Sequence, residues 1–337
     1  MPGGGRKASC PAERRRGRTF ASAEGGRGVN ETAGITVLER AQGALLGLAC
    51  GDAVGTAVEF KLRGTFHPVT DMVGGGPFRL QPGQWTDDTV MALCLAESLL
   101  ACDAFNPRDQ MERYLRWYRT GYLSPTGRCF DIGNTVLQAL LRFGETEDPF
   151  SGPTEPDWAG NGSIMRLAPV ALFFHPDREA VDHFSGESSR TTHGAQESVA
   201  GCRILGGILH AALSGEGKRD LLLSVEESEW MSPRLKEIAR GGYLEKARDE
   251  IRGTGYVVNS LEAALWAFWT TTSFEGAILA AANLGDDTDT TAAVCGQVAG
   301  AHYGVGGIPD GWLQKLWERD MISELASRLM ARRPGGS

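Results

Sequence analysis

The sequence predicts an all-α fold, a single compact multi-helix bundle, from two observations. Nine segments repeat apolar residues with a period near 3.6, whereas the alternation typical of strands is scarce. Several segments are rich in Gly and Ala, among them GALLGLACGDAVG and AGCRILGGILHAAL, and small residues on a buried side allow helix backbones to approach closely. The predicted helices cover residues 37–54, 90–102, 108–120, 134–143, 164–174, 195–214, 260–271, 274–283 and 290–303.

Two stretches lack this periodicity. Residues 145–158, ETEDPFSGPTEPDW, contain three prolines and five acidic residues, so we expect a surface connector. Residues 224–255 are charged and mixed in character, which predicts one or two peripheral helices joined by loops.

The chain is expected to form one domain, residues 31–332, behind a disordered basic extension, residues 1–30. The 337 residues are 42% hydrophobic, and no long linker divides the apolar part of the chain. The extension carries seven Lys or Arg against two Glu and has no apolar core for a secretory signal. A mitochondrial-type presequence is a weaker alternative, because the amphipathic helical pattern is missing.

Charge and cysteine content exclude several classes of protein. Outside the extension there are 27 basic and 40 acidic side chains, which argues against a broad nucleic-acid surface. The seven cysteines are scattered without CxxC spacing, so we expect a reducing, cytoplasmic location and no thiolate zinc site. No run of 18 apolar residues is present, and we expect no membrane association.

A first acidic cluster, WTDDT, precedes the predicted helix 90–102. Thr86, Asp87 and Asp88 in this cluster are explained, taken alone, as the capped first turn of an ordinary helix.

A second cluster, GDDTDTT, opens the helix 290–303 and makes capping an insufficient explanation. It places three carboxylates within four residues, and such close anions repel each other unless cations neutralise them. The two clusters together therefore predict an all-oxygen site for Mg²⁺ or Mn²⁺, with enough ligands for two ions.

Other candidate residues have two interpretations each. Glu59 follows a helix that Gly55 can end, and it is either a catalytic carboxylate on a mobile loop or a surface glutamate. The loop GNGSIMR either presents backbone N–H groups to an anion such as a diphosphate or forms a simple turn and cap. For His193 in TTHG and Asp131 in FDIGNT, a structural role and helix capping are the default explanations.

Taken in order, GDAVGTAVE, WTDDT, FDIGNT, GNGSIMR, TTH and NLGDDTDT resemble the ADP-ribosylglycohydrolase family over residues 38–311. The resemblance implies an all-α bundle with a central dinuclear metal site. It also implies metal-dependent hydrolysis of the N- or O-glycosidic bond that joins ADP-ribose to a modified acceptor.

The resemblance also assigns residues to roles. It implies that Glu59 and Asp88 are catalytic, with Glu59 protonating the leaving group or orienting substrate and water. It implies that Asp131 lies near the substrate ribose, that a loop binds the diphosphate and distal ribose, and that His193 lies near the same ligand. The loop residues are Gly160, Asn161, Gly162, Ser163 and Met165. Two Mg²⁺ or Mn²⁺ ions are expected on Thr86, Asp87, Asp88, Asp287, Asp289 and Thr290, where the choice of Asp287 over Asp286 rests on the resemblance alone.

The acceptor is the least determined part of the prediction. The motif GDDTDT blends GGDTDT, which is more typical of relatives acting on serine-linked ADP-ribose, with GDDADT, which is more typical of arginine-linked ones. We favour an arginine-linked protein substrate. The alternatives are a serine-linked or small-molecule conjugate, a non-catalytic ADP-ribose-binding relative, and a phosphate-ester hydrolase, although no GxxxxGK[ST] loop is present.

Overall fold

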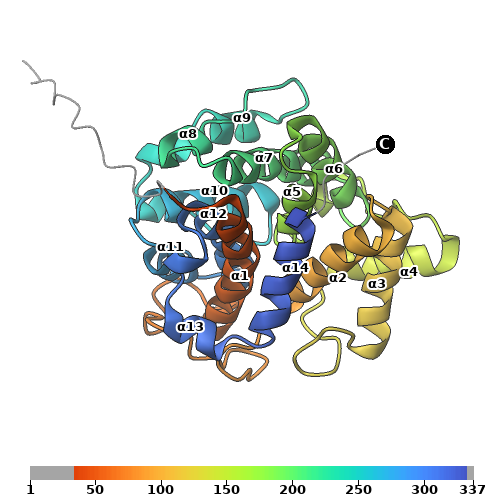
Figure 1. Ribbon diagram of the computed structural model, residues 1–337, viewed down its shortest axis with the longest axis horizontal. Coiled ribbons are helices and arrows are strands. Elements are labelled where there is room, and N and C mark those ends of the chain that lie inside the picture. The colour runs from red at the N-terminus through yellow and green to blue at the C-terminus, as the bar shows by residue number, and fades with distance from the viewer. Residues whose placement is uncertain (1–33, 332–337) are drawn as a thin grey trace, which may run out of the picture. The chain divides into compact units, whose positions relative to one another are not determined.

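A computed structural model describes residues 34–331, in which two long helices, α1 (Val37–Gly55) and α12 (Thr288–Tyr303), pack directly against each other (Figure 1). α1 begins with a capping box in which the Thr36 hydroxyl accepts from the Glu39 N–H and the Glu39 carboxylate accepts from the Thr36 N–H. Almost all of its residues from Arg40 onward are buried. These two helices form the middle of the helical array.

Glycines spaced four residues apart let the two backbones touch. A Cβ atom on Gly43 would lie 2.1 Å from the carbonyl oxygen of Gly300, and one on Gly47 would lie 2.3 Å from that of Gly296. Residues four apart lie on the same side of a helix, so the glycines make a continuous groove that receives the partner helix. The expectation that Gly-rich helices approach closely is confirmed.

The remaining helices surround this pair. Contacts with α1 or α12 come from α2 (Asp87–Cys102), α5 (Ala168–Phe174), α7 (Gln196–Leu213), α10 (Val257–Trp269), α11 (Phe274–Ala282) and α14 (Arg319–Ala331). Further from the pair lie α3 (Pro107–Thr120), α4 (Asn134–Thr146), α6 (Arg178–Arg190), α8 (Lys218–Leu222) and α9 (Pro233–Ala239). The short helix α13 (Asp310–Lys315) also contacts α1. Within residues 34–331 no β-strand forms, and the all-α prediction is confirmed.

The nine predicted helices are all present. The observed and predicted boundaries differ most at the N-terminal ends of helices whose first turn is polar. α2 starts at Asp87 and α12 at Thr288, so the acidic clusters lie in the first turns of these helices. The predicted helix 164–174 is shorter, because α5 starts only at Ala168. The first two residues of the connector 145–158 belong to α4, and the rest is a loop that ends in a short 3-10 turn, Pro156–Trp158.

Four helices were not predicted, namely α6, α8, α13 and α14, whereas α9 lies in the stretch 224–255 where peripheral helices were expected. The buried face of α6 is made mainly of Ser and Gly, including Ser185, Gly186 and Ser189, so it lacks the apolar periodicity that would reveal it. The division into a basic extension and a domain beginning at residue 31 stays a prediction, because residues 1–33 lie outside the described part of the chain.

One segment, Val37–Val58, is long and apolar enough by composition to cross a membrane. It consists of α1 and the 3-10 turn Thr56–Val58, and 94% of its apolar 18-residue window is buried inside the protein. Such burial is typical of the core helix of a bundle.

The contact between α1 and α12 makes Gly47 a sensitive position. Gly47→Ala forces the new Cβ against the Gly296 carbonyl, and we expect the free energy of unfolding to fall by roughly 3 kcal/mol. Gly144→Ala is the matched control, because Gly144 is an exposed residue of α4 with no atom near its Cβ position. That variant should be neutral or more stable by about 0.5–1 kcal/mol. Urea unfolding of both proteins measures the difference, and equal stabilities would contradict a direct backbone contact.

Candidate active site

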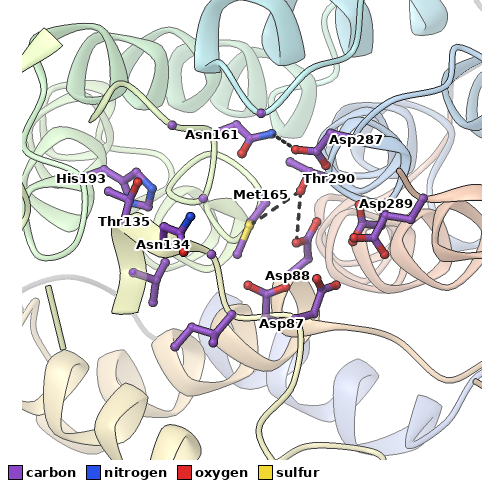
Figure 2. A pocket seen from close by; sticks show the side chains of 18 of the residues that line it. Asp87, Asp88, Asn134, Thr135, Asn161, Met165, His193, Asp287, Asp289 and Thr290 are labelled. Carbon is purple, nitrogen blue, oxygen red and sulfur yellow. Dashed lines mark hydrogen bonds between the residues drawn. The ribbon is translucent and has the colours of Figure 1, made fainter. Parts of the chain in front are cut away.

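The two acidic clusters meet at a cavity of about 420 Å³ (Figure 2). Asp87 and Asp88 reach it from the first turn of α2, and Asp287 and Asp289 reach it from the start of α12. Because the N-terminal ends of two helices face the same space, their dipoles favour anionic groups there.

Most of the predicted site residues line this cavity. They are Glu59, Asp87, Asp88, Asp131, Gly160, Asn161, Gly162, Met165, His193, Asp287, Asp289 and Thr290. Thr86 and Ser163 do not line it. Thr86 is buried with its hydroxyl 3.3 Å from Asp289 Oδ2, and Ser163 Oγ lies 2.9 Å from Ser189 Oγ.

The capping explanation does not account for the acidic residues. Thr86 and Asp287 occupy the N-cap positions of α2 and α12, yet neither side chain makes a capping hydrogen bond. Gly133, not Asp131, is the N-cap of α4, and Asp131 Oδ2 has no partner among the described residues. These carboxylates are therefore held in the cavity for a reason other than helix initiation.

Several buried carboxylate oxygens lack partners that would neutralise them. Thr290 Oγ1 lies 3.3 Å from Asp88 Oδ1, and Asn161 Nδ2 donates to Asp287 Oδ2 at 2.9 Å. Asp88 Oδ2 and Asp289 Oδ1 have no hydrogen-bond partner in the described part of the chain. Burial, reinforced by the neighbouring carboxylates, raises the pKa of both aspartates well above its ordinary value. A cluster of unpaired carboxylate oxygens with a threonine hydroxyl fits a hard divalent cation such as Mg²⁺ or Mn²⁺.

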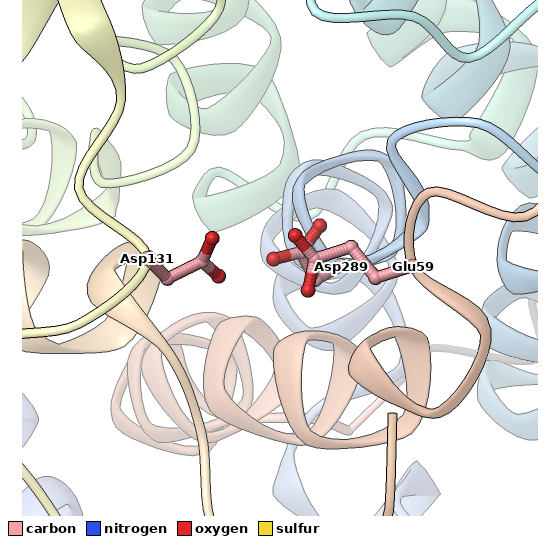
Figure 3. Close-up of side chains that lie close together, drawn as sticks. All are labelled: Glu59, Asp131 and Asp289. Carbon is pink, nitrogen blue, oxygen red and sulfur yellow. The ribbon is translucent and has the colours of Figure 1, made fainter. Parts of the chain in front are cut away.

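Glu59 joins Asp131 and Asp289 from two other elements, with one carboxylate oxygen of each lying within 4.8 Å of the others (Figure 3). Glu59 follows the 3-10 turn after α1 and is only 4% exposed, so the surface interpretation of this residue is wrong. Burial and the carboxylate of Asp131 raise the pKa of Glu59 to about 10, and burial with Asp87 raises that of Asp131 to about 11. Without a cation both groups hold protons at neutral pH.

Backbone pairing fixes the Glu59 loop to the second acidic cluster. The Phe60 N–H donates to the Asp286 carbonyl and the Asp286 N–H donates to the Lys61 carbonyl, both at 2.8 Å. Arg63 Nε donates to the Leu284 carbonyl at 2.8 Å. The backbone of Asp286 thus joins the two loops, whereas Asp287 lines the cavity. The structure therefore distinguishes two aspartates that the sequence pattern leaves equivalent.

Asp52 is a residue of this site that sequence reasoning missed. Its fully buried carboxylate accepts from the Thr86 N–H at 2.9 Å, the Thr86 hydroxyl at 3.0 Å, the Thr89 N–H at 3.1 Å and the Thr89 hydroxyl at 2.6 Å. α1 therefore caps α2 from outside and positions the first acidic turn. The available signal was a lone acid inside the apolar stretch GLACGDAVG.

Asp52→Asn tests this cap. The amide offers one acceptor oxygen and turns an N–H group toward the donors of Thr86 and Thr89, so we expect the protein to lose about 2 kcal/mol of stability. Mg²⁺ affinity should fall as well, because the Asp87–Asp88 turn is displaced. Asp310→Asn, an exposed position, controls for the loss of one charge. Urea unfolding and Mg²⁺ titration give both quantities, and wild-type values for each would refute the positioning role.

The raised pKa values predict a pH-dependent effect of metal on stability. Glu59 and Asp131 ionise near pH 4 in the unfolded chain but near 10 and 11 in the folded protein, so folding takes up protons between these limits. The stability these groups support is complete below about pH 4 and is lost as pH rises toward 10. In EDTA the melting temperature should fall from pH 7 to pH 9, and Mg²⁺ should raise it more at pH 9 than at pH 7. Calorimetry at both pH values measures the two shifts, and equal shifts would contradict the prediction.

Comparison with known proteins identifies the family. Residues 33–337 match the ADP-ribosylglycohydrolase family. The chain is 48% identical to "ADP-ribosylarginine hydrolase Tri1" of Serratia proteamaculans, over 88% of this chain and 80% of that protein. It is 36% identical to "ADP-ribosyl-[dinitrogen reductase] glycohydrolase" of Rhodospirillum rubrum, over 84% and 92%. A solved "ADP-ribosylglycohydrolase-related protein complex" matches with a TM-score of 0.78 and 43% identity, over 88% of this chain and 98% of that one. The six motifs, the helical fold and these matches agree that the chain belongs to the ADP-ribosylglycohydrolase family.

Proposed function

We propose that this protein hydrolyses the glycosidic bond that joins ADP-ribose to arginine side chains of proteins, with divalent metal ions as cofactors. The observation that carries the proposal is the cavity in which both acidic clusters, Glu59 and the Gly160–Gly162 loop lie together. A metal site beside an anion-binding loop suits a substrate with a diphosphate and a ribose.

Two relatives support arginine as the acceptor. The proteins of Serratia proteamaculans and Pseudomonas putida, at 48% and 49% identity, are both named ADP-ribosylarginine hydrolase. The human "ADP-ribosylhydrolase ARH3" is more distant, at 28% identity over 87% of this chain and 94% of that protein. A serine-linked or small-molecule conjugate is the alternative substrate within the same chemistry.

The metal ligands in this proposal are Thr86, Asp87, Asp88, Asp287, Asp289 and Thr290. When bound, divalent ions would polarise a water molecule and hold ribose hydroxyls beside the anomeric carbon. Asp88 would help to orient that water, because its Oδ2 atom is free of hydrogen bonds to described residues.

Glu59 would supply the proton for the leaving group. Its Oε2 atom has no hydrogen-bond partner in the described part of the chain, and burial raises the pKa of its carboxyl, which favours the protonated form. Departure of the arginine nitrogen from an oxocarbenium-like centre is easier when that nitrogen is protonated. Asp131, close to both Glu59 and Asp289, would contact the substrate ribose.

The loop at Gly160 would bind the diphosphate. In the described residues the N–H groups of Gly162 and Ser163 donate to no protein acceptor, while those of Ile164 and Met165 return to the Asn161 carbonyl. Free N–H groups in a turn form a favourable site for phosphate oxygens.

A cytoplasmic location is also part of the proposal. The six cysteines in the described part of the chain are all free thiols, and four of them are buried. Free thiols suit a reducing compartment.

The decisive experiment incubates the protein with arginine- and serine-ADP-ribosylated peptides in Mg²⁺, Mn²⁺ or EDTA and quantifies free ADP-ribose. We expect metal-dependent release that is faster from the arginine peptide. Glu59→Gln should reduce the rate by about 10²–10⁴-fold and retain ADP-ribose binding, because only the proton donor is lost. Release of AMP or phosphate would indicate attack at phosphorus, and binding without release would indicate a non-catalytic relative.

A further inference from the structure

A buried arginine lies behind the wall of the cavity that carries His193. Arg166 is fully buried and donates through Nη2 to the Thr192 hydroxyl at 2.7 Å. The same hydroxyl lies 2.9 Å from His193 Nδ1. Arg166, Thr192 and His193 therefore form a continuous hydrogen-bonded chain that ends at the cavity.

The direction of each hydrogen bond in this chain follows from its donors. A guanidinium can only donate, so Thr192 Oγ1 accepts from Arg166. The single hydroxyl hydrogen of Thr192 then has one available acceptor among the described residues, the Nδ1 atom of His193. If Nδ1 carried a proton, the hydroxyl would accept from both sides and its own hydrogen would have no partner.

The opposite edge of the imidazole faces the glycine loop. Cβ atoms added to Gly160 and Gly162 would lie 3.2 Å and 3.0 Å from His193 Nε2. His193 lines the cavity, and its Nε2 atom makes no hydrogen bond to the rest of the described chain. Figure 2 shows this ring on the side of the cavity opposite Asp289.

The histidine has little freedom to turn away from this position. Its backbone N–H donates to the Ser189 carbonyl at 2.7 Å, and its carbonyl accepts from the Ser189 hydroxyl at 2.9 Å. Ser163 Oγ lies 2.9 Å from Ser189 Oγ, within hydrogen-bond distance, which ties the glycine loop to the same anchor. Burial, followed by the charge of Arg166, lowers the pKa of His193 to about 3, so the ring is neutral in the working range of the protein.

We infer that Arg166 and Thr192 are positioning residues that lock His193 in its Nε2–H tautomer, which makes the ring a fixed neutral donor to an oxygen of the bound nucleotide. The identity of that ligand, ADP-ribose, rests on the proposed function. The hydrogen bond made by one ring nitrogen of a histidine sets the role of the other nitrogen. With the other tautomer, the Nε2 lone pair of His193 would face the ligand oxygen and repel it. The chain of donors thereby selects an acceptor-rich ligand at this wall.

Two-bond ¹H–¹⁵N NMR spectra of ¹⁵N-histidine-labelled protein test the tautomer directly. We expect a pyridine-type Nδ1 and a pyrrole-type Nε2 for His193, assigned by the signals that disappear in His193→Gln. Thr192→Val removes the hydroxyl with little change in shape, so we expect the His193 signals to change and ADP-ribose to bind about tenfold more weakly by calorimetry. Thr192→Ser should restore both readouts.

The control is Thr191→Val, since Thr191 is equally buried but its hydroxyl bonds to the Ser188 carbonyl and to Gln110. That variant should bind ADP-ribose as the wild type does. A pyrrole-type Nδ1 in the wild type, or unchanged affinity in Thr192→Val, would overturn the inference. Wild-type protein that has the Nε2–H tautomer but does not bind ADP-ribose would refute the proposed function and leave the hydrogen-bonded chain intact.

Discussion

The direct backbone contact between α1 and α12 is the constraint on which the site depends. Where α1 ends and α12 begins, a Cβ on Gly55 would lie 2.3 Å from the Thr288 carbonyl oxygen, and the Thr288 hydroxyl donates to the Gly55 carbonyl at 2.7 Å. The end of α1 is thus joined to the beginning of α12. Glu59, which follows α1, and Asp289, in the first turn of α12, are near each other because of this junction, and any side chain at Gly55 would separate them.

The acidic cavity in turn constrains its surroundings. Buried carboxylates without compensating partners are unfavourable. Here the N-terminal ends of α2 and α12 and nearby threonine hydroxyls stabilise them in part, and a bound cation would neutralise them further. Asp52 differs from the other acids because four hydrogen bonds from Thr86 and Thr89 satisfy it fully. Its role is to hold the acidic first turn of α2, while Asp88 and Asp289, each with an oxygen that lacks a partner among the described residues, line the cavity.

The sequence predicted the features that depend on residues close together in the chain, and it missed those that depend on contacts between residues far apart in the chain. The two acidic clusters were evident because each stands in a short polar motif before an apolar helix, although the pattern alone did not distinguish Asp287 from Asp286. Spacing left Glu59 undecided, since its burial arises from the pairing of its loop with Asp286, more than 200 residues away. Asp52 gave only a weak signal, a lone acid in an apolar stretch, and Arg166 gave none, because the role of a buried charged residue is understood only when its partners are known. α6 was missed for a related reason, since its buried serines and glycines meet α7 through small surfaces rather than apolar ones.

The cavity has two chemically different walls, and this difference bears on how a substrate would lie in it. Carboxylates from Glu59, Asp131 and Asp289 make one wall, while N–H groups of the glycine loop and the neutral ring of His193 make the other. The donors of the second wall would bind an anionic diphosphate, whereas the carboxylate oxygens of the first wall would need a cation to hold further oxygens of the ligand. The proposed orientation follows: the diphosphate lies at Gly162 and His193, and the anomeric carbon lies at Glu59. A neutral donor at His193 suits this arrangement, because its Nε2–H group can bind a phosphate oxygen without adding positive charge to a cavity that is proposed to hold metal ions.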